Sequence, residues 1–162
     1  ISDIYDSLEK FSEDGTKILY GGVKDISSLN REATISRSTI PFNILKKQWH
    51  SIRPAHPRSQ GVIFNRMIFE QGLCFDTKYK IAGDSKLLLQ VLANEIPVML
   101  DYTISKMQSG GISSEISARN LLFNELIMIS EDLNYKINPL RLILQVVKNN
   151  IKILLHRVFK MY

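Results

Sequence analysis

The chain has 162 residues, of which 44% are hydrophobic and 23% charged, the composition of a globular protein with one domain or slightly more. Its formal charge of +5 admits an anionic partner but identifies none. A single cysteine excludes an internal disulfide, three scattered histidines argue against a zinc cluster, and no charge-free apolar run is long enough to span a bilayer.

Positive charge is concentrated near the C-terminal end. Between Leu133 and Tyr162 there is no Asp or Glu, whereas six residues are basic: Lys136, Arg141, Lys148, Lys152, Arg157 and Lys160. The first 132 residues are therefore close to neutral. Any attraction for an anionic partner is expected from the last 30 residues.

The first part of the chain alternates between helical and strand-like patterns. The pattern predicts a helix over 2–14, a strand over 16–23, a polar loop over 24–40 with an extended piece at 32–37, and a helix over 41–49. A turn-rich loop at 52–60 precedes a strand from 61, which runs into a short helix at 67–71. This order indicates an α/β fold with about four strands.

The second part stays mixed up to about residue 112 and is wholly helical after it. A helix is predicted over 84–93, with Leu87, Leu88, Val91 and Leu92 on one side, and an extended run follows over 96–107. After the glycine loop at 108–114 come two long helices, 114–133 and 139–160. We therefore divide the chain into an α/β part, 1–113, and a C-terminal helical pair, 114–162.

Five short motifs, taken in order, resemble the second half of glycosyltransferase family 2 enzymes, which have the GT-A fold. They are His56-Pro57, Gly72-Leu73-Cys74-Phe75-Asp76, Lys80-Ile81-Ala82-Gly83-Asp84, Leu87 to Gln90, and Gly110-Gly111-Ile112-Ser113. The stretch "ILYGGV" is also similar to a family strand that usually reads "YGD", although Gly22 here occupies the acidic place. The resemblance covers roughly residues 1–114.

This resemblance implies a partial GT-A-like mixed sheet with flanking helices, and inverting transfer of a sugar from a nucleotide-sugar donor to a saccharide or lipid-linked acceptor. The donor half, with the Asp-x-Asp motif that holds a divalent metal (Mg or Mn), is absent from this sequence. The chain alone is then expected to bind no metal and to be inactive. A bacterial surface-polysaccharide enzyme in the cytoplasm, or peripheral on the inner face of the cell membrane, is the expected context.

Asp84 is the candidate catalytic residue. In inverting transfer the acceptor hydroxyl loses a proton as it attacks, and a fixed carboxylate can accept that proton. By resemblance Asp84 occupies the position of this general base. A carboxylate at a helix start can instead be an ordinary cap or first-turn acid, which is the structural alternative.

The candidate substrate-binding residues are His56, Arg58, Gln60, Gly110 and Gly111. Arginine matches phosphate geometry, and His and Gln side chains hydrogen-bond sugar hydroxyls. Two consecutive glycines let the backbone approach a ligand closely. The alternatives are a solvated turn and an ordinary loop before a helix.

Four other residues are interpreted as structural. Phe75 and Cys74 are expected in the core, and Asp76 is expected to close a turn or bind backbone amides. The lone Trp49 is expected to pack rather than to stack on a sugar.

The last helix is basic and amphipathic. Its polar residues advance in steps of three and four, opposite a broad apolar face. Such a helix suits an anionic membrane surface, and a non-catalytic membrane- or partner-binding module is the alternative function. Packing on its own domain and a dimer contact remain open. Sparse aromatic residues argue against nucleic acid as a partner.

Overall fold

The computed structural model describes residues 15–26, 35–37, 40–49, 54–108, 115 and 118–160. The strands are β1 (Ile18–Ile26), β2 (Ile35–Arg37), β3 (Val62–Phe64) and β4 (Val98–Gln108). The helices are α2 (Phe42–Lys46), α3 (Met67–Glu70), α4 (Gly83–Asn94), α5 (Arg119–Asp132) and α6 (Pro139–Lys160), with a short 3-10 turn, η1 (Ser59–Gly61). The helix predicted over 2–14 lies outside the described residues.

β1 is the centre of a mixed four-stranded sheet. One edge of β1 pairs antiparallel with β3 and then with β2, and the other edge pairs parallel with β4. Because β2 and β3 pair with different halves of β1, the sheet is only three strands wide. The predicted α/β class, with a mixed sheet, flanking helices and two C-terminal helices, is confirmed.

At two glycines, one in β1 and one in η1, the backbones of neighbouring segments lie too close together for a side chain. A Cβ on Gly21 would lie 2.7 Å from Ile104 and 2.8 Å from the Tyr102 carbonyl, so only glycine lets β4 run this close to β1. A Cβ on Gly61, in η1, would lie 2.6 Å from the Gly21 carbonyl. The backbone of η1 therefore packs directly against the backbone of β1 where the two cross.

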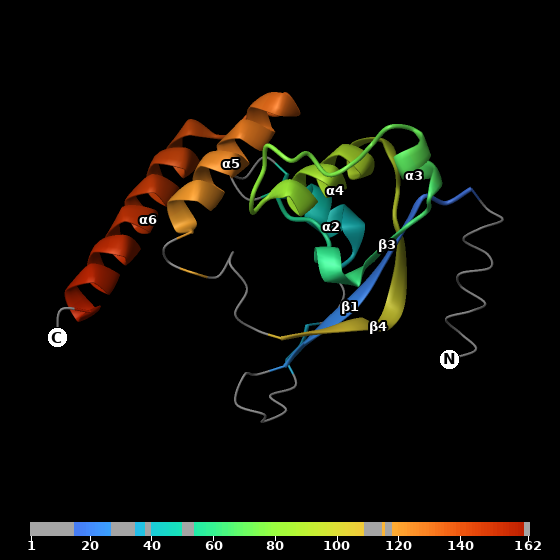
Figure 1. Ribbon diagram of the computed structural model, residues 1–162, viewed down its shortest axis with the longest axis horizontal. Helices are drawn as coiled ribbons and strands as arrows, with labels where there is room; N and C mark the ends of the chain where they lie inside the picture. The colour runs from blue at the N-terminus through green and yellow to red at the C-terminus, as the bar shows by residue number, and fades with distance from the viewer. Residues whose placement is uncertain are drawn as a thin grey trace.

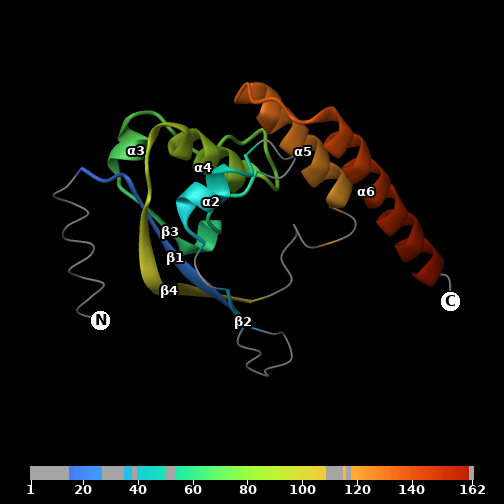
Figure 2. The same ribbon diagram turned by 180° about the vertical axis from the view of Figure 1, so that it is seen from behind.

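Helix α4 forms the middle of the core. Its predicted apolar side, Leu87, Leu88, Val91 and Leu92, packs against Ile18 of β1 and Ile68 of α3. Leu89 points the other way, into a cluster with Leu122, Leu126 and Ile129 of α5. Figures 1 and 2 show α4 between the sheet and α5, with α6 outermost. α5 thus shares a core with α4, across the sequence boundary we placed at 113/114.

Two expectations for the loop after α3 are wrong. Phe75 is 57% exposed and Cys74 is exposed, although both were expected in the core. The loop is held instead by polar contacts of Asp76, which accepts a hydrogen bond from the Lys78 amide, as expected, and pairs with Lys86 Nζ. Trp49 packs against both core clusters, and its indole donates to the Ala55 carbonyl.

Within the part of the chain that the structure describes, no helix combines the length and apolar character needed to cross a membrane.

Candidate functional site

The candidate site lies where η1 meets the start of α4. η1 contacts β1, β4 and α4. Arg58, the residue just before η1, bonds the last residues of two parallel strands: Asp25 near the end of β1 and Met107 near the end of β4. The carboxyl ends of parallel strands are where open α/β sheets bind their ligands.

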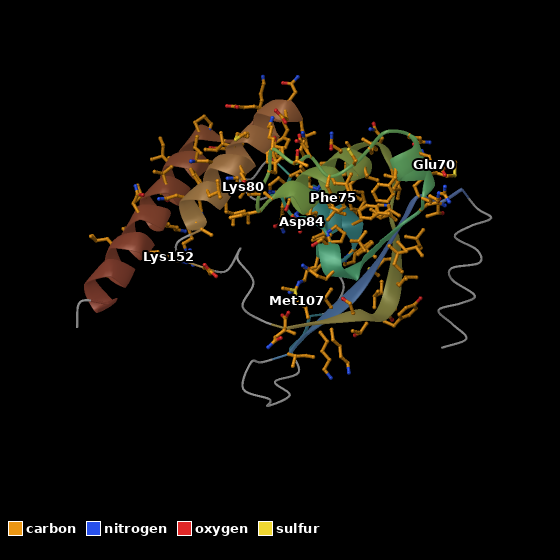
Figure 3. The ribbon with its side chains drawn as sticks, viewed as in Figure 1. Glu70, Phe75, Lys80, Asp84, Met107 and Lys152 are labelled. Carbon is orange, nitrogen blue, oxygen red and sulfur yellow. The ribbon has the colours of Figure 1, made fainter. Side chains whose placement is uncertain are left out.

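Asp84, labelled in Figure 3, is the second residue of α4, and its carboxylate accepts two hydrogen bonds. Oδ2 accepts a 2.6 Å bond from Ser59 Oγ, and Oδ1 accepts a 2.7 Å bond from the Ser85 amide. The N-cap residue is Ala82, so Asp84 is not the cap of this helix but an acid of its first turn that binds a first-turn amide, as the structural alternative expected. Asp84 is partly exposed, and each oxygen retains acceptor capacity beyond its one bond.

His56 joins this arrangement through Ser85. Nδ1 lies 2.7 Å from the Pro57 carbonyl, and because a carbonyl only accepts, Nδ1 carries a proton. Nε2 lies 2.9 Å from Ser85 Oγ, so in the neutral ring it accepts a hydrogen bond from the serine hydroxyl. His56 and Asp84, 28 residues apart in the sequence, therefore both bond Ser85, His56 at its hydroxyl and Asp84 at its amide.

Arg58 and Gln60 differ in their surroundings. The guanidinium of Arg58 forms two bonds to the Asp25 carboxylate, 2.9 and 2.8 Å long, and so fixes the loop to the sheet. Gln60 is exposed on η1. A contact of either residue with a substrate stays a prediction. Gly110 and Gly111, two and three residues beyond the end of β4, lie outside the described residues.

The sequence reasoning missed the carboxylate that organises the start of α4. Glu125 of α5 is 2% exposed and accepts three backbone N–H groups, those of Lys80, Ile81 and Ala82, at 2.7, 2.9 and 2.8 Å. It therefore ties the segment immediately before α4 to α5. The sequence did contain a signal for this role. Glu125 falls on the same helix face as the apolar residues Leu122, Leu126 and Ile129.

A second polar network lies beside it. Asp132 accepts bonds from Lys78, Tyr79 and Lys86, and Lys86 also pairs with Asp76. Lys78, then Tyr79 and Lys86, hold the pKa of Asp132 well below its ordinary value. Burial, followed by the bond to Asp132, raises the pKa of Tyr79. These contacts join the loop before α4, α4 itself and α5.

A cavity of about 310 Å³ lies along the later turns of α4. Its walls come from Trp49, Pro54, Leu73, Leu89, Gln90, Ala93, Asn94, Leu133 and Tyr135. Asp84 is not part of this wall, so the cavity and the Asp84 arrangement are separate features.

Among the residues that the structure describes, no group of three or more His, Cys, Asp or Glu side chains is arranged to hold a metal ion. Comparison of the chain with models of protein families, with curated proteins and with solved structures finds no match in any of the three.

Proposed function

We propose that this chain is the acceptor-side part of an inverting glycosyltransferase with a GT-A-like fold. The observation that carries the proposal is the carboxylate of Asp84, held by Ser59 and by the Ser85 amide at the carboxyl-end side of two parallel strands. A proton acceptor must be fixed within hydrogen-bond distance of the group it deprotonates, and these two bonds fix this one.

The proposed reaction is a single displacement. The acceptor hydroxyl oxygen forms a bond to the anomeric carbon of the donor sugar while the bond from that carbon to the nucleoside diphosphate breaks. The hydroxyl proton passes to Asp84, and the electron pair of the broken bond leaves with the diphosphate. The acceptor is a saccharide or a lipid-linked saccharide.

The other residues have supporting roles in this proposal. His56 positions Ser85, whose amide binds Asp84. Arg58 holds the loop through Asp25, and the exposed amide of Gln60 is free to reach an acceptor hydroxyl from η1. Gly110 and Gly111 follow β4 in the sequence and would line the acceptor region.

The nucleotide-sugar donor would be bound mainly by a part of the protein beyond this chain. Among the described strands β4 pairs only with β1, so its other edge is where further strands would be added. The expected Mg or Mn ion would be held by that same part of the protein, since no group of three or more His, Cys, Asp or Glu among the described residues is arranged to hold a metal.

The test is Asp84→Asn in the protein that carries both halves. Loss of the proton acceptor should lower kcat by about 100-fold or more, while nucleotide-sugar binding measured by calorimetry stays unchanged. Asp101→Asn, at an exposed position on β4, is the matched control and should keep full activity. Turnover by Asp84→Asn within about threefold of wild type would overturn the role of Asp84 as base.

A further inference from the structure

The outermost helix, α6, exposes a continuous row of apolar side chains. The apolar stripe consists of Leu140, Ile143, Leu144, Val147, Ile151, Leu154 and Leu155, each between 48% and 65% exposed. At 100° per residue these positions fall within an arc of about 120° on one side of the helix. Apolar surface gathered in this way on a monomer marks an interaction site.

The stripe is turned away from the rest of the protein. Leu142, on the opposite side of α6, packs against the cluster formed by Leu122, Leu126 and Ile129 of α5, and Gln145 on that side is half-buried. Figures 1 and 2 both show α6 alongside α5 and farthest from the sheet. Packing on its own domain, one of the open interpretations of this helix, therefore does not cover the stripe.

Basic residues border the stripe. Lys148 and Lys152 are exposed on α6, Lys152 being labelled in Figure 3, and Arg141, Arg157 and Lys160 belong to the same helix. No acidic residue occurs between Leu133 and Tyr162. The surface that the stripe contacts must therefore accommodate several positive charges.

This charge pattern decides whether the apolar stripe binds a second copy of the chain or an anionic membrane. Leu140, Leu144, Val147, Ile151 and Leu154 are spaced four, three, four and three residues apart, as in a coiled coil. A second copy would bring two basic helices together with no Asp or Glu on either of them to pair with the Lys and Arg side chains. Anionic lipid headgroups instead attract each Lys or Arg by about 1 kcal/mol and take up the apolar side chains at the acyl boundary.

We propose that α6 binds an anionic membrane surface, with the apolar stripe inserted at the headgroup level. The helix has 22 residues, so it would lie along the surface for about 33 Å rather than cross the bilayer. This contact goes beyond the proposed sugar transfer and does not depend on it, since α6 is distinct from the Asp84 site. Membrane binding by α6 would hold the Asp84 site near the membrane surface.

The experiment is flotation of the protein with vesicles of phosphatidylcholine alone and of phosphatidylcholine mixed with phosphatidylglycerol. The protein should float with the anionic vesicles, less so in high salt, and much less with the neutral ones. The paired variant Lys148→Glu and Lys152→Glu should lower the partition coefficient by about tenfold or more. Leu144→Ser with Leu154→Ser should lower it similarly, because both side chains are exposed and their loss leaves the fold intact.

The matched controls are Lys80→Glu and Phe75→Ser, which change an exposed charge and an exposed apolar residue outside α6. Both should float like the wild type. Failure of the wild type to float, or equal loss in the controls, would overturn the proposal. A dimer in light scattering that Leu144→Ser with Leu154→Ser dissociates, without vesicle binding, would assign the stripe to a second copy and also overturn it. Unchanged flotation in Asp84→Asn separates this result from the outcome of the sugar-transfer test.

Discussion

The hydroxyl of Ser59 donates a 2.6 Å hydrogen bond to Oδ2 of Asp84 and so joins η1 to the first turn of α4. This contact links two segments 25 residues apart. Because the other oxygen is bound by the Ser85 amide, the two bonds together fix the orientation of the Asp84 carboxylate.

In the proposed transfer reaction, Ser59→Ala should therefore lower kcat by about tenfold, with KM little changed, because the proposed base Asp84 loses one of the two bonds that orient it. Ser59→Thr keeps a hydroxyl and should restore most of the rate. Steady-state kinetics on both variants is the measurement. Equal rates for Ser59→Ala and wild type would show that this bond does not position a catalytic group.

Glu125→Ala should destabilise the protein by about 3 kcal/mol or more. Three backbone N–H groups, those of Lys80, Ile81 and Ala82, lose their acceptor in a largely buried place. Glu125→Gln should lose nearly as much, because its NH₂ group must face at least one of these donors. Urea unfolding measures both.

Glu131→Ala is the control for that experiment, since it removes an exposed acid from the same helix. Its stability should stay within about 0.5 kcal/mol of wild type. A midpoint for Glu125→Ala equal to that of Glu131→Ala would contradict the role of Glu125 in holding the segment before α4.

Asp132 should make stability depend on pH in the acid range. Its pKa in the folded protein is lowered, chiefly by the bond from Lys78, from an ordinary value of 3.8. A lowered pKa stabilises the fold above the unfolded-state value, and this contribution declines as pH falls through the acid range towards the folded-state pKa. Asp132→Asn should thus be less stable than wild type at pH 7.

The difference between the two proteins should shrink as pH falls below about 4. Thermal unfolding from pH 7 to pH 2.5 is the measurement. Lys78→Gln should remove part of the same dependence, because Lys78 is the largest cause of the shift. A difference between wild type and Asp132→Asn that stays constant with pH would rule out this linkage.

Gly61→Ala should destabilise the protein by about 1–3 kcal/mol, because the added methyl would lie 2.6 Å from the Gly21 carbonyl and backbone cannot move aside cheaply. Gly22→Ala is the matched control. Its methyl would make its closest contacts at 3.4 Å, with Thr103 and the Tyr102 carbonyl, and the smaller adjustment should cost less. Denaturant midpoints compare the two. An equal loss in both variants would mean that the tight crossing of η1 over β1 is not the cause.

The order and type of the elements could be read from the sequence because they depend on local periodicity. The strand that became β1, the helix that became α4 and the two C-terminal helices were all expected close to where they lie. The apolar set of Leu87, Leu88, Val91 and Leu92 faces the core as its spacing indicated. α5 begins at Arg119, five residues later than expected.

Burial in a loop was harder to infer. Phe75 and Cys74 looked like core residues by type, yet both are exposed, because the loop between α3 and α4 is anchored by the charge of Asp76. Residue type predicts burial within a periodic helix or strand, where the facing side is set by geometry. It predicts much less where the chain has no period.

The sequence by itself determined the succession of strands and helices, the acid in the first turn of α4, and the basic amphipathic character of α6. Only the tertiary structure decided that Asp84 is bound by Ser59 as well as by an amide of its own helix, that Glu125 holds the segment before α4, and that the stripe of α6 faces outward. The physical reason is distance along the chain. Periodicity is fixed by neighbouring residues, whereas these contacts join residues 25 to 45 positions apart, or depend on which side of a helix its neighbours cover.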